Sequence, residues 1–199
     1  WRGNDLAITP PKAFDLSGID IEAARKTRSI VMFIGPLIHR LEKFSLPQSG
    51  GCKLGSRTVR PHFYALEHFG VAIKTTSDAY ELPKKRATPR EIILYESGDT
   101  VTENALMAAA GYPGTVTIKY ASANYMVQEM CAFLQQLGVT IEGVGTTTLT
   151  VTGIETIDCD VEYTLAEDPT DSMFFLAAAI VTHSAITITR CPIEFLELE

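Results

Sequence analysis

The sequence predicts a protein that mixes helices and strands, α/β (α+β) in class, and that is built from a duplicated unit of about 70 residues. Two pairs of segments carry this prediction. Residues 68–74 read as the end of an amphipathic helix, a glycine stop and a strand, and residues 136–142 repeat this pattern 68 positions later. The alanine triplets 108–110 and 177–179 lie 69 positions apart, and each is followed by a strand-like segment. This period is too long for a common solenoid repeat and indicates a duplicated supersecondary unit.

Each copy is expected to contain a helix, a strand, a second helix and two further strands, in that order. Residues 29–40 have helical periodicity, and a second helix is expected to end at Phe69. The strand segments alternate apolar and polar side chains, as half-buried strands do. The expected strands are 44–46 and 71–74 in the first copy, 116–119, 139–142 and 147–151 in the second, and 185–188 in a third copy that has only begun.

Residues 126–137 form the clearest predicted helix. Met126, Met130, Phe133 and Leu137 lie along one of its faces. Apolar side chains at this spacing favour core packing over a cofactor site, so we expect this face to be buried.

Composition excludes several classes of protein. The chain is 46% hydrophobic and 21% charged, as a packed globular protein is. Its net charge of −7 disfavours a nucleic-acid partner and an anionic membrane surface, because both require a basic face. The apolar runs 30–38 and 173–181 are too short to span a bilayer.

The cysteine and histidine patterns indicate neither a disulfide framework nor a metal site. The four cysteines, at positions 52, 131, 159 and 191, lie far apart without a C-x-x-C motif, which favours the reducing cytoplasm. His62 and His68 flank Glu67 without the H-E-x-x-H spacing of a zinc site. We therefore expect no metal.

Basic residues gather around one glycine-rich segment of this acidic chain. Glycines let the backbone approach an anion closely, and guanidinium groups bind carboxylate or phosphate in a bidentate way. A cysteine in such a field has a stabilised thiolate. The pattern indicates either an anionic substrate next to a reactive Cys52 or an ordinary glycine turn with surface cations. The segment is 49–52, and the cations are Arg25, Lys26, Arg28, Lys53, Arg57 and Arg60.

The same segment carries a family resemblance. Residues 45–47 and 50–57 resemble the S-L-P-G-G-C-x-I-G-x-R signature of the UDP-N-acetylglucosamine 1-carboxyvinyltransferase (MurA) family of enolpyruvyl transferases. Residues 25–29 resemble its K-T-x-R-A-S segment, 102–109 its A-T-E-N-x-M-M-A-A segment, and 137–154 its L-G-A-x-I-x-G-x-G-T segment. The resemblance implies an inside-out α/β barrel made of two lobes, each with three βαβαββ units, as in the sister EPSP synthases.

The resemblance also implies an activity and its residues. The family moves the enolpyruvyl group of phosphoenolpyruvate onto the 3-hydroxyl of UDP-N-acetylglucosamine, in peptidoglycan synthesis, without a cofactor or a metal. Cys52 would protonate the methylene carbon of phosphoenolpyruvate, and Arg57 would hold its phosphate. His62 matches a histidine of the family's R-P-V-D-L-H segment. The implied sugar-nucleotide contacts are Arg28, Thr58, Val59, Arg60, Pro61, Gly98 and Asp99.

The sequence departs from the family pattern at several of these positions. Gln48 and Ser49 lengthen the catalytic loop, Thr58 replaces a proline, and Arg60 stands where the family usually has a nucleotide-binding aspartate. Residues 96–101 differ from the family's P-S-V-G-A, and 168–172 lack the arginine of its D-R-I-E-T. Two alternatives therefore stay open, a paralogue acting on another nucleotide and a non-catalytic lobe.

The resemblance divides the chain into a lobe at 1–163, with units at about 1–80 and 81–163, and an interlobe segment with the start of the second lobe at 164–199. The chain begins at Trp1 and corresponds to about half of such an enzyme. We therefore expect it to be inactive alone and to need the missing lobe of the same enzyme as its partner.

Overall fold

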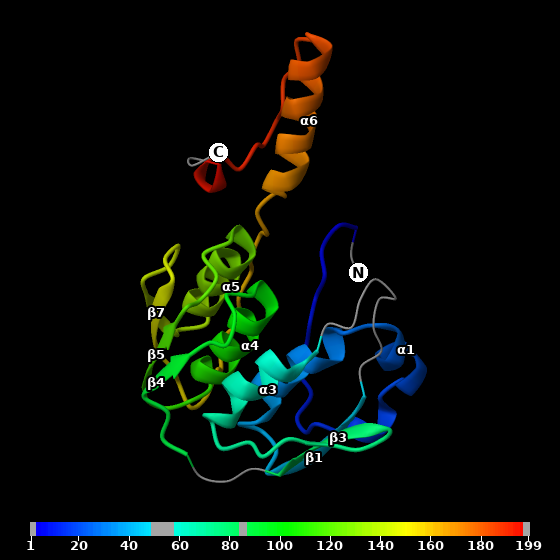
Figure 1. The fold of residues 1–199 in the computed structure, drawn as a ribbon, viewed down its shortest axis with the longest axis vertical. Coiled ribbons are helices and arrows are strands. Elements are labelled where there is room, and N and C mark those ends of the chain that lie inside the picture. Colours follow the sequence, from blue (N-terminus) through cyan, green and yellow to red (C-terminus); the bar gives the residue numbers. More distant parts are fainter. Residues whose placement is uncertain (1–2, 49–57, 84–86, 197–199) are drawn as a thin grey trace.

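The computed structural model describes residues 3–48, 58–83 and 87–196. Helices and strands fall into two consecutive groups, followed by a separate helix (Figure 1). The first group contains η1 (Leu16–Gly18), α1 (Ile21–Lys26), η2 (Ser29–Phe33), α2 (Ile34–Leu37), β1 (Lys43–Pro47), α3 (Arg60–Glu67), β2 (Lys74–Thr75) and β3 (Ala79–Pro83), where η denotes a 3₁₀ helix. The remainder contains β4 (Glu91–Ile93), α4 (Asp99–Ala110), β5 (Thr115–Lys119), α5 (Tyr125–Gln136), β6 (Thr140–Glu142), β7 (Thr148–Thr152), α6 (Pro169–Thr182) and η3 (Ile193–Phe195).

The two groups contain sheets with the same strand order. The first sheet has the order β1-β3-β2, and the second has β4-β5-β7-β6. Strands β1, β3 and β2 therefore correspond to β5, β7 and β6, and β4 is an additional strand parallel to β5. The second group runs strand, helix, strand, helix, strand, strand, which is the βαβαββ unit that the family resemblance implies; the repeat in the sequence predicts all of these elements except the leading strand β4.

Alternating side chains fix the register of both sheets. In the first sheet, Phe44 and Leu46 of β1 are buried opposite Leu82 and Tyr80 of β3. A one-residue slip would turn these side chains to the solvent, so the apolar face specifies the pairing. The corresponding buried residues of the second sheet are Val116, Ile118, Leu149 and Val151.

Two glycines end helical segments as predicted. Gly70 follows α3 with φ +84°, and Gly138 follows α5 with φ +97°. Glycine adopts this left-handed conformation without the steric cost that a Cβ imposes.

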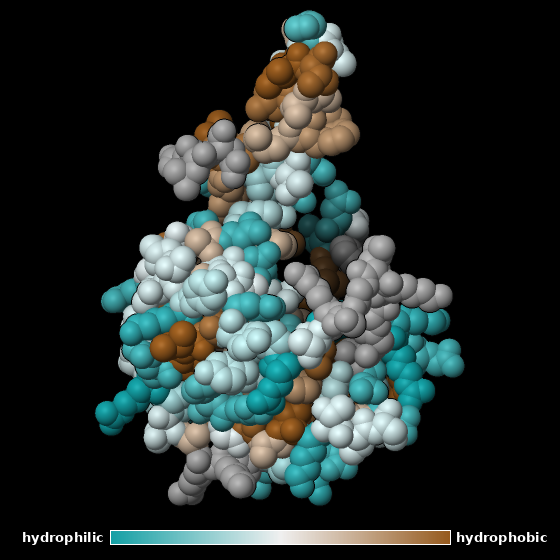
Figure 2. Space-filling view, viewed as in Figure 1, coloured by the Kyte–Doolittle hydropathy of each residue, from teal (hydrophilic) through white to brown (hydrophobic). Residues whose placement is uncertain are grey.

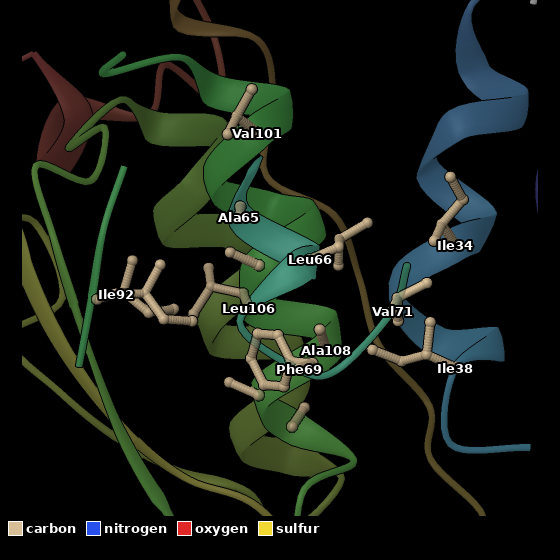
Figure 3. Close-up of a cluster of buried hydrophobic side chains, with 14 of the residues drawn as sticks. Ile34, Ile38, Ala65, Leu66, Phe69, Val71, Ile92, Val101, Leu106 and Ala108 are labelled. Carbon is tan, nitrogen blue, oxygen red and sulfur yellow. The ribbon is translucent and has the colours of Figure 1, made fainter. Parts of the chain in front are cut away.

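Helix α4 lies at the centre of the core. Eight of its twelve residues are buried, and it packs against α2, α3 and α5. Figure 3 shows Leu106 and Ala108 of α4 in one apolar cluster with Leu66 of α3 and Ile34 of α2. A helix that is apolar on nearly all sides needs neighbours on all sides, and these helices supply them.

Helices α2 and α4 contact each other at positions that the repeat makes equivalent. The Gly35 N–H donates to Asn104 Oδ1 at 2.9 Å, and His39 Nε2 lies 2.6 Å from the Ala108 carbonyl oxygen. Both pairs are 69 positions apart, so the two helices run parallel and in register. A Cβ at Gly35 would lie 2.5 Å from both the backbone oxygen and Oδ1 of Asn104, so the close approach requires glycine.

The prediction for the buried face of α5 is half wrong. Met126 is 40% exposed and Phe133 is 37% exposed, whereas Val127, Cys131 and Leu134 are buried. Both sets have helical spacing, and the sequence pattern does not show which one meets α4. Phe133 instead packs against Tyr163 in the segment that leads to α6, with ring centroids 5.4 Å apart.

Two further expectations are corrected. Residues 29–40 form a 3₁₀ helix and one α-helical turn, because Pro36 lacks an N–H and fits the first turn of a new helix better than the interior of a long one. Residues 185–188 are not a strand. Strand geometry requires a hydrogen-bonded neighbour, and none of the described strands lies beside them.

Helix α6 extends away from the two groups (Figure 1), and its apolar surface is prominent in Figure 2. Asp168 caps the helix by accepting a hydrogen bond from Thr170 N–H at 2.7 Å. Three of its fourteen residues are buried. The exposed apolar side chains are Phe174, Phe175, Leu176, Ile180 and Val181. None of the described helices is both long and apolar enough to cross a lipid bilayer.

The contact at Gly35 predicts a stability effect. Gly35→Ala should lower the free energy of unfolding by about 1–3 kcal/mol, because the added Cβ forces α2 and α4 apart. Urea unfolding of the two proteins measures this difference. Gly18→Ala is the matched control, since a Cβ there meets no atom within 4 Å. Equal stability of Gly35→Ala and the parent chain would contradict the proposed role of Gly35.

Candidate functional site: a cavity at the start of helix α4

A cavity of about 710 Å³ opens where the first turn of α4 lies near the start of α3 and the start of η2. Segments far apart in the sequence form its walls, and Met126 of α5 completes them. The predicted binding residues that line it are Arg28, Thr58, Val59, Pro61, Gly98 and Asp99. The structure therefore brings six predicted residues from three segments to one cavity.

Arg28 carries the positive charge of the cavity. Its Nη2 donates to the Thr58 carbonyl oxygen at 3.1 Å, which joins the turn before η2 to the segment that enters α3. The side chain is half-buried, and it is the one cation among the described residues that line the cavity. A guanidinium held this way can bind phosphate or carboxylate oxygens.

The opposite charge lies at the first turn of α4. Asp99 accepts hydrogen bonds from Ser122 Oγ at 2.5 Å and from Asn124 Nδ2 at 3.1 Å, so its carboxylate is fixed by the loop before α5. Glu96 folds toward Gly98, where its Oε1 would lie 3.3 Å from an added Cβ. Burial and the nearby Asp99 both raise the pKa of Glu103, one turn further along α4.

The structure separates the cations that cluster in the sequence. Arg25 pairs with Asp78 at 3.2 Å on the surface. Arg60 donates to both carboxylate oxygens of Glu67, at 2.7 and 3.3 Å, two helical turns along α3. Arg60 does not line the cavity, and its guanidinium is bound to Glu67, so its nucleotide contact stays a prediction. Cys52, Lys53 and Arg57 lie outside the described residues.

His62 lies at the wall of the cavity and is 6% exposed. Burial first, and then the positive charge of Arg28, lower the pKa of His62 to about 4. The imidazole is therefore neutral at physiological pH. Its Nδ1 lies 3.2 Å from Nδ2 of Asn104, a fully buried side chain.

Sequence reasoning missed Asn104 as part of this site. An amide within the apolar segment 101–110 was the available signal, because a buried polar side chain needs hydrogen-bond partners. Its partners come from α2, η2 and α3, and no pattern in the sequence shows that these elements meet there. Among the described residues, no group of three histidine, cysteine, aspartate or glutamate side chains is arranged to hold a metal ion.

Comparison with known families identifies the class of protein. The model of the EPSP synthase family (3-phosphoshikimate 1-carboxyvinyltransferase) matches residues 6–198, so the chain belongs to this family. The solved structure of the enolpyruvyl transferase NikO from Streptomyces tendae has the same fold. It superposes with a TM-score of 0.58 at 23% identity, over 75% of this chain and 36% of NikO. The predicted α/β fold of the enolpyruvyl transferases is confirmed.

Curated relatives show which members of the family the chain resembles. UDP-N-acetylglucosamine 1-carboxyvinyltransferase from Treponema denticola is 34% identical over 173 residues, which is 87% of this chain and 40% of the relative. The enzyme of the same name from Bradyrhizobium diazoefficiens is 30% identical over 98% of this chain and 45% of the relative. The predicted family resemblance is thus confirmed, and the chain spans less than half the length of these relatives.

The low pKa of His62 predicts a pH-dependent stability. The unfolded chain binds a proton at this residue below its ordinary pKa of 6.5, whereas the folded chain does so near 4. The contribution of neutral His62 is therefore complete above pH 6.5 and is lost as the pH falls to about 4. The loss amounts to about 3 kcal/mol.

Unfolding free energies of the parent chain and His62→Gln, measured between pH 4 and 8, test this prediction. The difference between the two curves isolates His62 from the carboxylates, which titrate in both proteins. Parallel curves throughout this range would show that His62 titrates normally in the folded state.

Proposed function

We propose that this chain supplies the sugar-nucleotide-binding lobe of an enolpyruvyl transferase of the UDP-N-acetylglucosamine 1-carboxyvinyltransferase type. The observation that carries the proposal is the convergence of six predicted binding residues on one cavity. The reaction would transfer the enolpyruvyl group of phosphoenolpyruvate to the 3-hydroxyl of UDP-N-acetylglucosamine, and it would serve peptidoglycan synthesis in the cytoplasm. The names of the curated relatives support this choice of acceptor.

The chemistry assigns a role to each part of the site. The acceptor hydroxyl oxygen would form a bond to C2 of phosphoenolpyruvate and pass its proton to a base of the second lobe, while Cys52 protonates the methylene carbon C3 as the general acid. Cleavage of the bond between C2 and the phosphate oxygen would then release inorganic phosphate, and return of a proton from C3 to the Cys52 thiolate would restore the double bond. Arg28 would bind the sugar nucleotide and Arg57 the phosphate. Fixed cations of this kind stabilise the developing charge without a metal or a cofactor.

A second candidate is transfer to another nucleotide. Glu96 and Asp99 place two carboxylates at the cavity against one guanidinium, which suits a diphosphate less well than a neutral loop would. Arg60, which stands in place of the family aspartate, is turned to Glu67. Calorimetric comparison of UDP-N-acetylglucosamine with other sugar nucleotides decides between these acceptors, and binding of none of them would favour a non-catalytic lobe.

Activity is expected when the second lobe is present. Residues 1–199, fused to the unmatched part of the Treponema denticola relative, should release phosphate from phosphoenolpyruvate only when UDP-N-acetylglucosamine is added. Cys52→Ala should lower this rate at least ~100-fold, because a general acid contributes about 10² to 10⁴. Cys52→Asp should retain activity, since a carboxyl group can also donate the proton.

Cys159→Ala is the control for these variants, because Cys159 is an exposed thiol without a proposed role. Normal turnover by Cys52→Ala would overturn the assignment of the acid.

We also propose that residues 1–163 form one lobe and that residues 164–199 join it to the second and begin that lobe. Helix α6 supports this division. Its alanines 177–179 correspond to 108–110 of α4, yet Ala177 is exposed where Ala108 is fully buried. The exposed apolar side chains of α6 and the unpaired segment 185–188 fit an incomplete unit. The occupant of this surface is the remainder of the enzyme, since the relatives are more than twice as long.

Cysteine labelling tests whether the second lobe covers α6. Val181 is 76% exposed, so Val181→Cys should react rapidly with a maleimide in the 199-residue chain. In the fusion described above it should react at least ~10-fold more slowly, because reaction then requires local opening. Thr75→Cys on exposed β2 is the control and should react equally in both. Equal labelling of Val181→Cys in both proteins would contradict the proposal. So would labelling that slows as the concentration of the 199-residue chain rises, because a second copy of the chain would then cover α6.

A further inference from the structure

The buried amide of Asn104 has a single consistent orientation. Its Oδ1 accepts a hydrogen bond from the Gly35 N–H at 2.9 Å, and its Nδ2 donates to the Val31 carbonyl oxygen at 3.0 Å. A backbone N–H is always a donor and a carbonyl oxygen is always an acceptor. If Oδ1 and Nδ2 were exchanged, Nδ2 would face the Gly35 N–H, another donor, and Oδ1 would face the Val31 carbonyl oxygen, another acceptor. The two backbone groups therefore fix Nδ2 on the side of His62.

This orientation determines the tautomer of His62. The second N–H of Asn104 Nδ2 points to Nδ1 of His62 at 3.2 Å, so Nδ1 must be the unprotonated, accepting nitrogen. A neutral imidazole then carries its proton on Nε2. If both nitrogens were protonated, the Nδ1–H would face the N–H of Asn104, and a positive charge would lie near Arg28. Both effects disfavour the imidazolium, in agreement with the lowered pKa of His62.

The Nε2–H of His62 has no hydrogen-bond partner within the described part of the chain. Every fully enclosed polar side-chain atom there is hydrogen-bonded, so Nε2 is not fully enclosed. Since His62 lines the cavity, its Nε2–H is left for whatever occupies that space. The charged groups around the cavity are Arg28 at the start of η2, Glu96 before α4 and Asp99 in its first turn.

We propose that Asn104 is a positioning residue that holds His62 as a neutral Nε2–H donor toward an acceptor oxygen of the sugar nucleotide. The proposal rests on the proposed function for the identity of the ligand, but the tautomer follows from the protein alone. A neutral donor selects an oxygen by geometry, and it leaves charge neutralisation to Arg28. His62 then binds in the same form across the physiological pH range.

The ligand-free test is the nitrogen NMR spectrum of His62 in the uniformly ¹⁵N-labelled 199-residue chain. Between pH 5.5 and 8 we expect the pattern of the Nε2–H tautomer, with Nδ1 unprotonated. Asn104→Asp keeps an acceptor for Gly35 but replaces the donor at Nδ1, so it should shift His62 to the Nδ1–H tautomer or the imidazolium. If this variant fails to fold, the parent spectrum still decides, because an Nδ1–H tautomer or an imidazolium at pH 7 overturns the proposal.

The second test is binding of UDP-N-acetylglucosamine, measured by calorimetry and by the Nε2–H resonance. Affinity of the parent chain should be independent of His62 titration from pH 5.5 to 8, and the resonance should move on binding. His62→Phe should weaken binding ~10-fold, whereas His62→Gln, whose amide can supply a donor near the same place, should stay within ~3-fold. A purely structural Asn104 would change stability while leaving the tautomer and the pH profile of Asn104→Asp unaltered.

Different outcomes contradict the identity of the ligand and the role of His62. If UDP-N-acetylglucosamine does not bind but His62 shows the expected tautomer, the proposed function is contradicted and the role of Asn104 remains. Binding without movement of the Nε2–H resonance, or with equal affinity in His62→Phe, overturns the donor role of His62.

Discussion

The structure depends on the close contact between α2 and α4, which Gly35 and Asn104 make together. The absence of a side chain at Gly35 lets the two backbones approach, and the Asn104 amide satisfies polar groups that this approach buries. Leaving a buried amide without partners costs about 1–3 kcal/mol, so the two residues need each other. Because Asn104 also reaches His62, one side chain joins the contact between two repeat units to the cavity wall.

This contact explains why the cavity has its position. The first turn of α4, the start of α3 and the start of η2 meet around Asn104 and His62, so the residues at their ends converge. Arg28 is then held at the same cavity as the N-terminal end of α4. The binding residues lie in loops, yet the helices of the core fix where those loops meet.

Much of the fold is predictable from local patterns, whereas the six predicted residues that line the cavity follow from the family resemblance. The alternation in β1, β5 and β7 and the stops at Gly70 and Gly138 are properties of a few adjacent residues. The buried face of α5 and the missing strand at 185–188 depend on which neighbours are present, which a local pattern does not contain. The same holds for Arg60, whose partner Glu67 is seven residues away on α3, and for Asn104, whose partners lie 42 to 73 positions away.

The duplicated units can be compared position by position for the residues that form the site. At the repeat offset of 69, Asn104 corresponds to Met173 in α6, whereas the alanine triplet and the acidic residue at the helix start (Asp99 and Asp168) are kept. The triplet is not a general feature of the unit, because positions 39–41 of the first copy are His-Arg-Leu and Ala177 of the third is exposed. The amide is needed only where a neighbouring helix and a histidine must be joined. The polar contact that organises the cavity therefore belongs to the copy that contains α4.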